Sequence, residues 1–128
     1  GKPPPVQSPL IIYARGPVEL DSTLAQADLC VCHAGEATLA QALLSGVPLL
    51  LMPMQTEQFL IARRVAQTGA GFNAAQGSRP VDYAALVVSL VRESSARVAA
   101  QAFAANHAGF TAQQQTDALV TEFERLLG

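Results

Sequence analysis

The chain has 128 residues and a mass of 13.4 kDa, a size typical of one domain, since domains run to about 100–200 residues. Hydrophobic residues make up 50% of it and charged residues only 14%, a balance that excludes an intrinsically disordered protein. The net charge of −2 and the isoelectric point near 5.6 leave no basic field to attract nucleic acid or an anionic membrane surface.

The sequence predicts neither a membrane span nor a disulfide framework. The longest apolar run, residues 47–54, contains two prolines and is far shorter than the ~20 residues that cross a bilayer. Cys30 and Cys32 are too few for a disulfide scaffold and suit a reducing compartment, which predicts a cytoplasmic location. The start, Gly-Lys-Pro-Pro-Pro, has no initiator methionine or signal peptide, and its prolines extend residues 1–9 into a lead-in. We interpret residues 1–128 as a single domain, cut or processed from a larger protein.

The first elements expected along the chain are two strands separated by a short helix. The apolar run 10–13 is a candidate buried strand. A short helix follows over 21–27, with Asp21 or Ser22 as its cap. The segment 28–33 (DLCVCH) predicts a second strand, because its continuous apolar character fits burial on both faces.

The middle of the chain predicts two helices that alternate with two strands. Residues 36–45 predict a helix rich in alanine and leucine, and residues 47–54 a third, entirely apolar strand. Thr56 would cap a helix over 56–68, and residues 71–74 predict a fourth, shorter strand. A glycine follows each helix, where it readily adopts the left-handed conformation that ends a helix.

Three helices are expected to close the chain. Asp82 would cap the first, which runs to residue 93, and Ser94 or Ser95 the second, which runs to about residue 106. Thr111 and Gln114 form a capping-box pattern for the last. The apolar stripe of that helix is formed by Leu119, Val120, Phe123, Leu126 and Leu127.

This order of elements predicts the fold class. Strands that alternate with helices form parallel β-α-β units with right-handed crossovers, and hence a three-layer α/β domain. We expect about four parallel strands, flanking helices and a helical C-terminal tail. Ligands of such open sheets bind beyond the carboxyl ends of the strands. Functional side chains are therefore expected directly after the strands 28–33 and 47–54.

The segment after the strand 28–33 has the composition of an anion site. A helix N-terminus there presents free N–H groups and a positive dipole end, which suits a diphosphate. Gly35 permits close backbone approach, Thr38 offers a hydroxyl, and His33 can hydrogen-bond to a phosphate oxygen. The alternative is a tight turn at Gly35 beside a structural histidine, and spacing alone does not decide between the two.

Glu57 and Gln58 follow the strand 47–54 at the start of the next helix, and therefore face the same edge of the sheet. Both can bind hydroxyl groups, although an acid in a first helical turn also simply complements the helix dipole. No second pair of ligands accompanies Cys30, Cys32 and His33, so we predict no metal site. Neither a Ser-His-Asp nor a Cys-His arrangement can be argued, and no catalytic residue is assigned to this chain.

These motifs together resemble a known family. His-x-Gly-x-x-Thr at 33–38, then Gly-Val-Pro at 46–48, then Pro-x-x-x-Glu-Gln at 53–58, in this order and spacing, resemble the donor-binding signature of GT-B glycosyltransferases. The likeness covers residues 10–75 closely and is greatest to UDP-glycosyltransferase-like enzymes. It implies the C-terminal, donor-binding domain of such an enzyme, a Rossmann-like half-domain.

The resemblance also implies a role for individual residues. The donor diphosphate would be bound by His33, Gly35, Glu36, Ala37 and Thr38. The base and ribose would be bound by Arg15, Val18 and Gln41, and the sugar by Glu57 and Gln58. Three of these positions depart from the family pattern: Arg15 stands for a tryptophan that stacks on the base, Gln41 for a glutamate toward the ribose, and Glu57 for an aspartate.

The implied function is to bind a nucleoside diphosphate sugar for a glycosyltransferase that uses neither a cofactor nor a metal. In the family the acceptor site and catalytic base belong to an N-terminal domain, so this chain alone is expected to be inactive. An alternative is a non-catalytic module or split subunit that associates with an acceptor-binding partner or with itself, since an apolar sheet edge needs covering. A weaker alternative is a sugar-nucleotide epimerase of the same fold.

Overall fold

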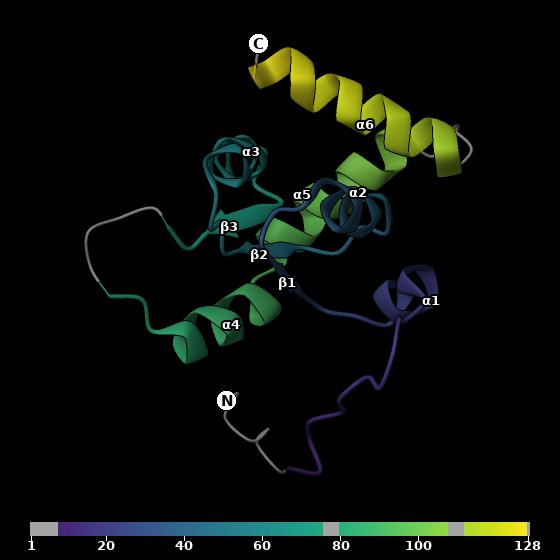
Figure 1. Ribbon diagram of the computed structural model, residues 1–128. Coiled ribbons are helices and arrows are strands. Elements are labelled where there is room, and N and C mark those ends of the chain that lie inside the picture. Colours follow the sequence, from purple (N-terminus) through teal and green to yellow (C-terminus); the bar gives the residue numbers. More distant parts are fainter. Residues whose placement is uncertain (1–7, 76–79, 108–111, 128) are drawn as a thin grey trace.

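The computed structural model describes residues 8–75, 80–107 and 112–127 and has the three layers expected (Figure 1). Its sheet has three parallel strands in the order β1-β2-β3: β1 (Cys30–Cys32), β2 (Leu49–Leu51) and β3 (Gly71–Asn73). The register aligns Cys32 with Leu51 and Leu51 with Asn73, so the three strands end together at one edge.

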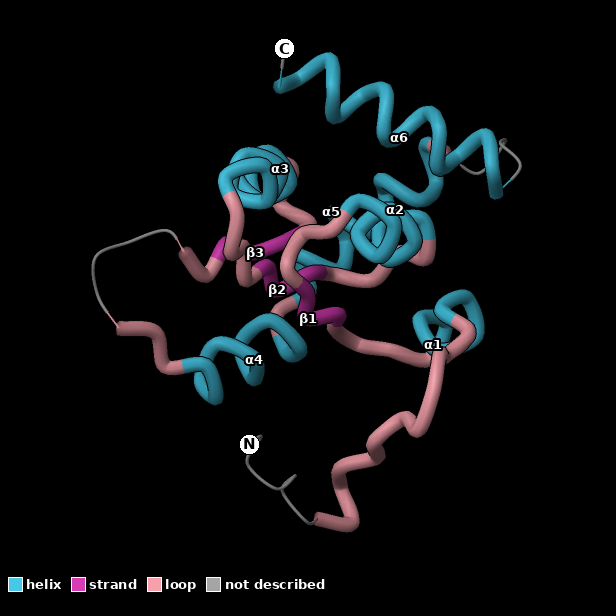
Figure 2. The backbone as a smooth tube through the Cα atoms, in the orientation of Figure 1, coloured by secondary structure: helices cyan, strands magenta, loops and turns pink. Residues whose placement is uncertain are grey.

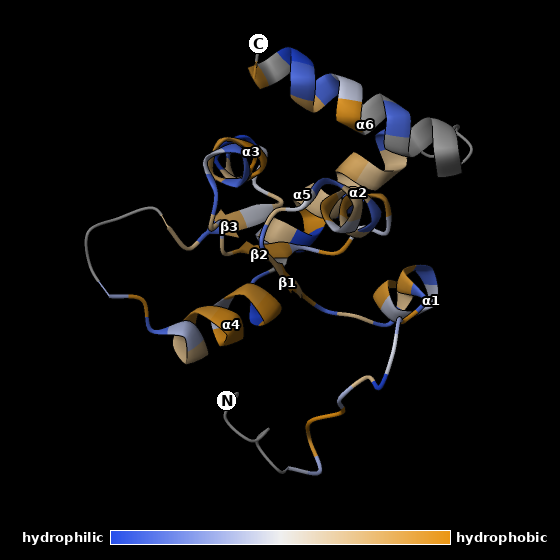
Figure 3. Cartoon of the chain, in the orientation of Figure 1, coloured by the Kyte–Doolittle hydropathy of each residue, from blue (hydrophilic) through white to orange (hydrophobic). Residues whose placement is uncertain are grey.

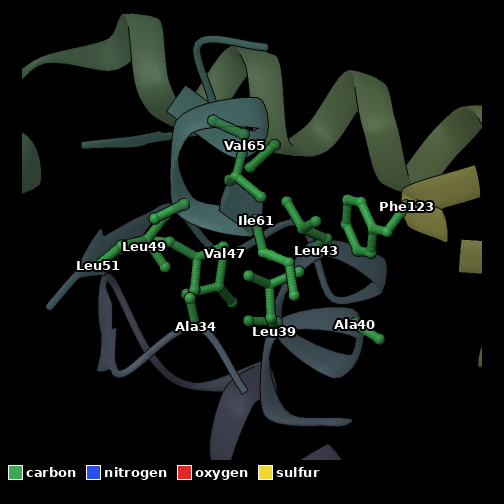
Figure 4. Close-up of a cluster of buried hydrophobic side chains, with 14 of the residues drawn as sticks. Ala34, Leu39, Ala40, Leu43, Val47, Leu49, Leu51, Ile61, Val65 and Phe123 are labelled. Atoms are coloured by element: carbon green, nitrogen blue, oxygen red, sulfur yellow. The ribbon is translucent and has the colours of Figure 1, made fainter. Parts of the chain in front are cut away.

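The central strand β2 is buried on both faces, as its apolar sequence predicts. Leu49 and Leu51 point into the larger core, and Leu50 points to the opposite face. The larger core is built by three helices, α2 (Glu36–Leu44), α3 (Thr56–Gln67) and α6 (Ala112–Leu127), with α1 (Leu20–Ala25) beside α2. Figure 4 shows Leu43 of α2 between Ile61 of α3 and Phe123 of α6.

The opposite face of the sheet is covered by α4 (Tyr83–Arg92). Figure 3 shows that this helix is largely hydrophobic. Its Leu86, Val87 and Leu90 form a smaller core with Leu50. Helix α5 (Ser94–Asn106) joins the two layers, because its Ala96 belongs to this smaller core and its Ala100 to the larger one. None of the helices in the described ranges is both long and apolar enough to cross a membrane.

The predicted strand at 10–13 does not form, and the sheet has three strands rather than four. This segment is a turn followed by loop (Figure 2), with Leu10 92% and Ile12 94% exposed. Ser8 explains the turn: its carbonyl oxygen accepts from the Ile11 N–H at 3.1 Å and its Oγ from the Leu10 N–H at 3.1 Å. These local hydrogen bonds satisfy backbone donors that a strand would give to a neighbour.

Several helix ends differ from the prediction by one or two residues. Asp82 caps α4 as expected, its carboxylate accepting from the Ala85 N–H at 3.1 Å. However, the N-caps of α1, α3 and α5 are Glu19, Gln55 and Glu93, not the neighbouring hydroxyl or Asp residues. The expected cap at Thr111 lies outside the described residues.

The C-terminal helix and the helix-ending glycines agree with the sequence. Phe123 of the predicted stripe is buried, and Val120 and Leu127 are half-buried. Gly46 and Gly69 adopt the left-handed conformation with φ of +70° and +84°. A Cβ at Gly46 would lie 3.4 Å from Gln101 Cγ, an ordinary contact, so the positive φ and not a lack of space favours glycine in the turn after α2.

Two adjacent residues of α3 test how much the larger core contributes to stability. Ile61 is 2% exposed and Leu60 46%. We expect Ile61→Ala to lower the free energy of unfolding by about 2–5 kcal/mol, because it removes buried methyl groups and leaves a cavity. Leu60→Ala on the solvent side should cost less than about 1 kcal/mol. Urea unfolding monitored by circular dichroism measures both, and equal losses would contradict this packing.

Candidate functional site

Two adjoining hollows lie at the edge where the strands end. The first has a volume of about 410 Å³ and is lined by His33, Gly35, Thr38 and Gln58, together with Val31, Cys32 and Met52. The second has a volume of about 250 Å³ and is lined by Gly35, Glu36, Glu57 and Gln58, together with Ala34, Gln55 and Ile61. Gly35 and Gln58 belong to both. The segments after β1 and β2 therefore meet at this edge, as the sequence predicts.

His33 is held across the gap between β1 and β2. Its Nδ1 lies 3.1 Å from the carbonyl oxygen of Met52, directly beyond the point where the Met52 N–H donates to Cys32. Because a carbonyl oxygen only accepts, the proton of a neutral His33 ring resides on Nδ1. Nε2 of the neutral ring then carries a lone pair, and it becomes a donor only when the imidazole is protonated.

The turn from β1 into α2 leaves the N-terminus of that helix open. Gly35 is the N-cap of α2, and no side chain in the described ranges caps it. The N–H groups of Glu36, Ala37 and Thr38 therefore have no partner within the helix and keep the positive end of its dipole. A Cβ at Gly35 would meet no atom within 4 Å, so packing does not require a glycine here.

Ala34 makes this sharp turn at a cost in backbone energy. It is fully buried and has a φ of +70°, a conformation that costs an L-residue with a Cβ roughly 1–2 kcal/mol. The surrounding core holds it there, since Ala34 packs among the buried residues of α2, β2 and α3 (Figure 4). The strained residue lies in the middle of the three residues that lead from the end of β1 into α2.

Gln58 has a structural role that the sequence did not predict. Its Oε1 accepts from the Met54 N–H at 2.8 Å and from the Gln55 N–H at 3.2 Å, which holds the loop between β2 and α3. Only the NH₂ group of this amide remains to donate to a ligand. Glu57 beside it is exposed and offers acceptor oxygens to the second hollow.

The structure does not bring every predicted site residue to the hollows. Arg15 and Val18 lie in the exposed loop before α1, and Ala37 is exposed on α2. Gln41 is half-buried on α2, one turn beyond Thr38, and its Oε1 is buried without a hydrogen-bond partner among the described residues. None of these four side chains lines either hollow, and their roles stay predictions.

Cys32 and Met52 are members of the site that the sequence analysis missed. Cys32 ends β1 and Met52 follows β2, so their positions next to His33 and before Pro53 were the available signal. Cys30 and Cys32 lie on one face of β1, where both are half-buried against the larger core. Within the described ranges, no group of three or more His, Cys, Asp or Glu residues could hold a metal ion.

Comparison with known proteins places this chain in a family. The family model of the glycosyltransferase family 28 C-terminal domain matches residues 18–118. Two sterol 3-beta-glucosyltransferases are similar. The one from Eremothecium gossypii is 33% identical over 66 residues, which are 52% of this chain and 5% of that protein. The one from Kluyveromyces lactis is 36% identical over 63 residues, which are 49% of this chain and 5% of that protein.

A third relative is bacterial. It is the UDP-N-acetylglucosamine--N-acetylmuramyl-(pentapeptide) pyrophosphoryl-undecaprenol N-acetylglucosamine transferase of Deinococcus deserti, which is 40% identical over 63 residues. The matched region is 46% of this chain and 16% of that protein. The chain therefore spans only a small part of the length of each of these relatives.

The contact between His33 and Met52 predicts a tautomer that can be measured. We expect the neutral His33 ring to be protonated on Nδ1, because only that form donates to the carbonyl oxygen. A long-range ¹H–¹⁵N spectrum at about pH 8.5, where imidazoles are neutral, distinguishes the two tautomers. His107→Gln removes the other imidazole of the chain, so the remaining signals belong to His33. A ring protonated on Nε2 would contradict the structure.

Proposed function

Because this chain belongs to the glycosyltransferase family 28 C-terminal domain family, we propose that it binds the nucleoside diphosphate sugar donor of a glycosyltransferase. The observation that carries this proposal is the juxtaposition of the open N-terminus of α2 with the fixed ring of His33 at one hollow. The N–H groups at the start of α2 and the Nε2 of a protonated His33 ring would present hydrogen-bond donors to the same space, while Nδ1 holds the ring against Met52.

The diphosphate is proposed to lie in the first hollow, over the N-terminus of α2. The backbone N–H groups of residues 36–38 and the Thr38 hydroxyl would donate to its oxygens. The open space at Gly35 allows a phosphate to approach the backbone closely. The carboxylate of Glu36 lines the second hollow, so that residue would serve the anion through its backbone and not its side chain.

His33 is proposed to bind the diphosphate as a cation. Its Nδ1 is committed to Met52, so only Nε2 can reach a ligand, and Nε2 donates only when the ring is protonated. The resulting charge-assisted hydrogen bond is stronger than a neutral one. During transfer, negative charge develops on the leaving diphosphate, and the imidazolium and the helix dipole would both stabilise it.

The sugar is proposed to occupy the second hollow. Glu57 would accept hydrogen bonds from its hydroxyl groups, and the free NH₂ group of Gln58 would donate to them. The base and ribose are proposed to contact Arg15, Val18 and Gln41. A ribose hydroxyl is the kind of donor that would satisfy the buried Gln41 Oε1, which lies on the same side of α2 as Thr38.

The acceptor site and the catalytic base are proposed to reside in another domain or subunit, so the isolated chain would not transfer sugar. We propose no metal and no resident cofactor, since helix dipole and imidazolium supply the positive charge. A cytoplasmic location would give such a site its nucleotide sugar. Strand β1 is an edge of the described sheet, and self-association through it is an alternative that light scattering of the chain would test.

Nucleotide binding can be tested without the rest of the enzyme. In a thermal-shift titration, UDP, TDP or GDP at 100 times its Kd should stabilise the chain by about 2.7 kcal/mol. Gly35→Ala should keep the unliganded Tm, since its Cβ meets open space, but weaken binding by about tenfold or more, since the Cβ blocks the phosphate. If none of the three nucleotides raises the Tm at millimolar concentration, the proposal is contradicted.

The proposed contact of His33 with the diphosphate predicts the effect of removing its ring. In the same thermal-shift titration, His33→Ala should weaken UDP binding by about tenfold or more, because it removes a hydrogen bond to a charged group. An affinity equal to that of the unchanged chain would contradict a role for His33 in binding the diphosphate.

A further inference from the structure

The two cysteines of the chain lie together at the end of the edge strand. Cys30 and Cys32 are two residues apart in β1, so their side chains leave the same face of the sheet. Both are half-buried against the larger core. Only Cys32 reaches the first hollow, where it lies beside His33 and near Thr38. No role in donor binding accounts for this thiol.

The surroundings of Cys32 favour its thiolate. The Cys30 thiol donates a hydrogen bond to the Cys32 sulfur, and this contact lowers the pKa of Cys32 to about 7 although burial opposes the shift. The Ala34 N–H and the neighbouring His33 act in the same direction. The same hydrogen bond, together with burial, raises the pKa of Cys30 far above its ordinary value. Of the two thiols, Cys32 is the one that lines the first hollow, and the contact with Cys30 favours its anionic form.

We propose that Cys32 is a nucleophilic thiol in the wall of the first hollow, which reacts with small uncharged soft electrophiles, and that its alkylation closes the hollow to the nucleotide. Cys30 is a positioning residue that acts through the Cys32 sulfur. The expectation that alkylation closes the hollow to the nucleotide rests on the proposed donor site. The reactivity itself rests only on the two thiols, the turn at Ala34 and the hollow.

The reaction with iodoacetamide defines the chemistry. Cys32 gives its proton to solvent, and the thiolate attacks the CH₂ carbon of the reagent. A sulfur–carbon bond forms, the carbon–iodine bond breaks, and iodide leaves with the electron pair. The first hollow favours such a reagent because Val31 and Met52 make part of its wall apolar.

An adduct at this position would compete with a phosphate. Cys32 and His33 are adjacent, and the carboxamidomethyl group would occupy the space that the phosphate needs next to His33. A bound diphosphate would in turn disfavour the thiolate, because it adds negative charge beside the sulfur. Nucleotide and electrophile are therefore expected to exclude one another.

Labelling of the native chain with iodoacetamide tests the reactivity. We expect Cys32 to be alkylated at least tenfold faster than Cys30 at about pH 7, with a rate that rises through that pH as the thiolate forms. Fragment-ion mass spectrometry assigns each adduct to its cysteine and needs no variant. Equal rates at the two positions, or labelling of Cys30 alone, would overturn the proposal.

Variants of Cys30 separate positioning from structure. Cys30→Ser keeps a donor to the sulfur and should retain most of the rate, whereas Cys30→Ala removes it and should slow labelling at pH 7 on the order of tenfold. Above about pH 9 the thiolate forms in either case, so the Cys30→Ala rate should recover. If labelling of Cys32 in Cys30→Ala stays slow above about pH 9, the positioning role of Cys30 is overturned.

Protection of Cys32 by bound nucleotide tests separately whether alkylation closes the first hollow. At a concentration that stabilises the unmodified chain, UDP should slow the alkylation of Cys32 by about tenfold. The Tm of the alkylated chain should no longer rise when UDP is added. Labelling that proceeds unchanged under bound UDP would overturn the closure of the hollow. If UDP stabilises nothing, the donor proposal fails while fast labelling of Cys32 still supports the thiol. The two failures are thus distinguishable.

Discussion

The pairing of β1 with the buried strand β2 fixes the position of everything at the functional edge. Leu49 and Leu51 anchor β2 in the larger core, and Leu50 anchors it in the smaller one, so this strand cannot slide or turn over without exposing leucines. The ladder that joins β1 to it continues from the Met52 N–H to the carbonyl of Cys32. The next contact along the same seam is that of His33 with Met52. The ring is therefore held by the register of the sheet.

The site combines positive and negative groups in two separate places. The open end of α2 and His33 belong to the first hollow, while the carboxylates of Glu36 and Glu57 line the second. A nucleotide sugar has the same division, since its diphosphate is anionic and its sugar carries neutral hydroxyl groups. This separation keeps the acidic side chains in a different hollow from the proposed diphosphate site.

The strain at Ala34 and the thiol at Cys32 follow from the same short connection. The three-residue turn between β1 and α2 has a positive φ at Ala34, and it directs the Ala34 N–H toward the Cys32 sulfur. That N–H and the Cys30 thiol favour the anionic form of the sulfur. The turn that leaves the N-terminus of α2 open thus also directs the Ala34 N–H to the Cys32 sulfur.

The amino-acid sequence was enough to predict the alternation of helices and strands, the apolar central strand and the glycines that end α2 and α3. It was also enough to identify the motif residues, which are His33 to Thr38, Glu57 and Gln58. These follow from local chemistry, because periodicity, glycine geometry and motif spacing do not depend on distant partners. The strand expected at 10–13 failed for the complementary reason: an apolar run becomes a strand only where a ladder receives it, and Ser8 satisfies its N–H groups locally.

Which atoms of the motif remain available to a ligand depends on contacts that form only in the folded chain. The Met52 carbonyl takes the Nδ1 proton of His33, and two backbone N–H groups take the amide oxygen of Gln58. The hollow adds Cys32 and leaves out Arg15 and Val18. Each of these outcomes depends on a contact between segments joined by the sheet register or a loop. The physical reason is that a hydrogen-bonding group can be counted from the sequence, whereas its partner is assigned only when the chain has folded.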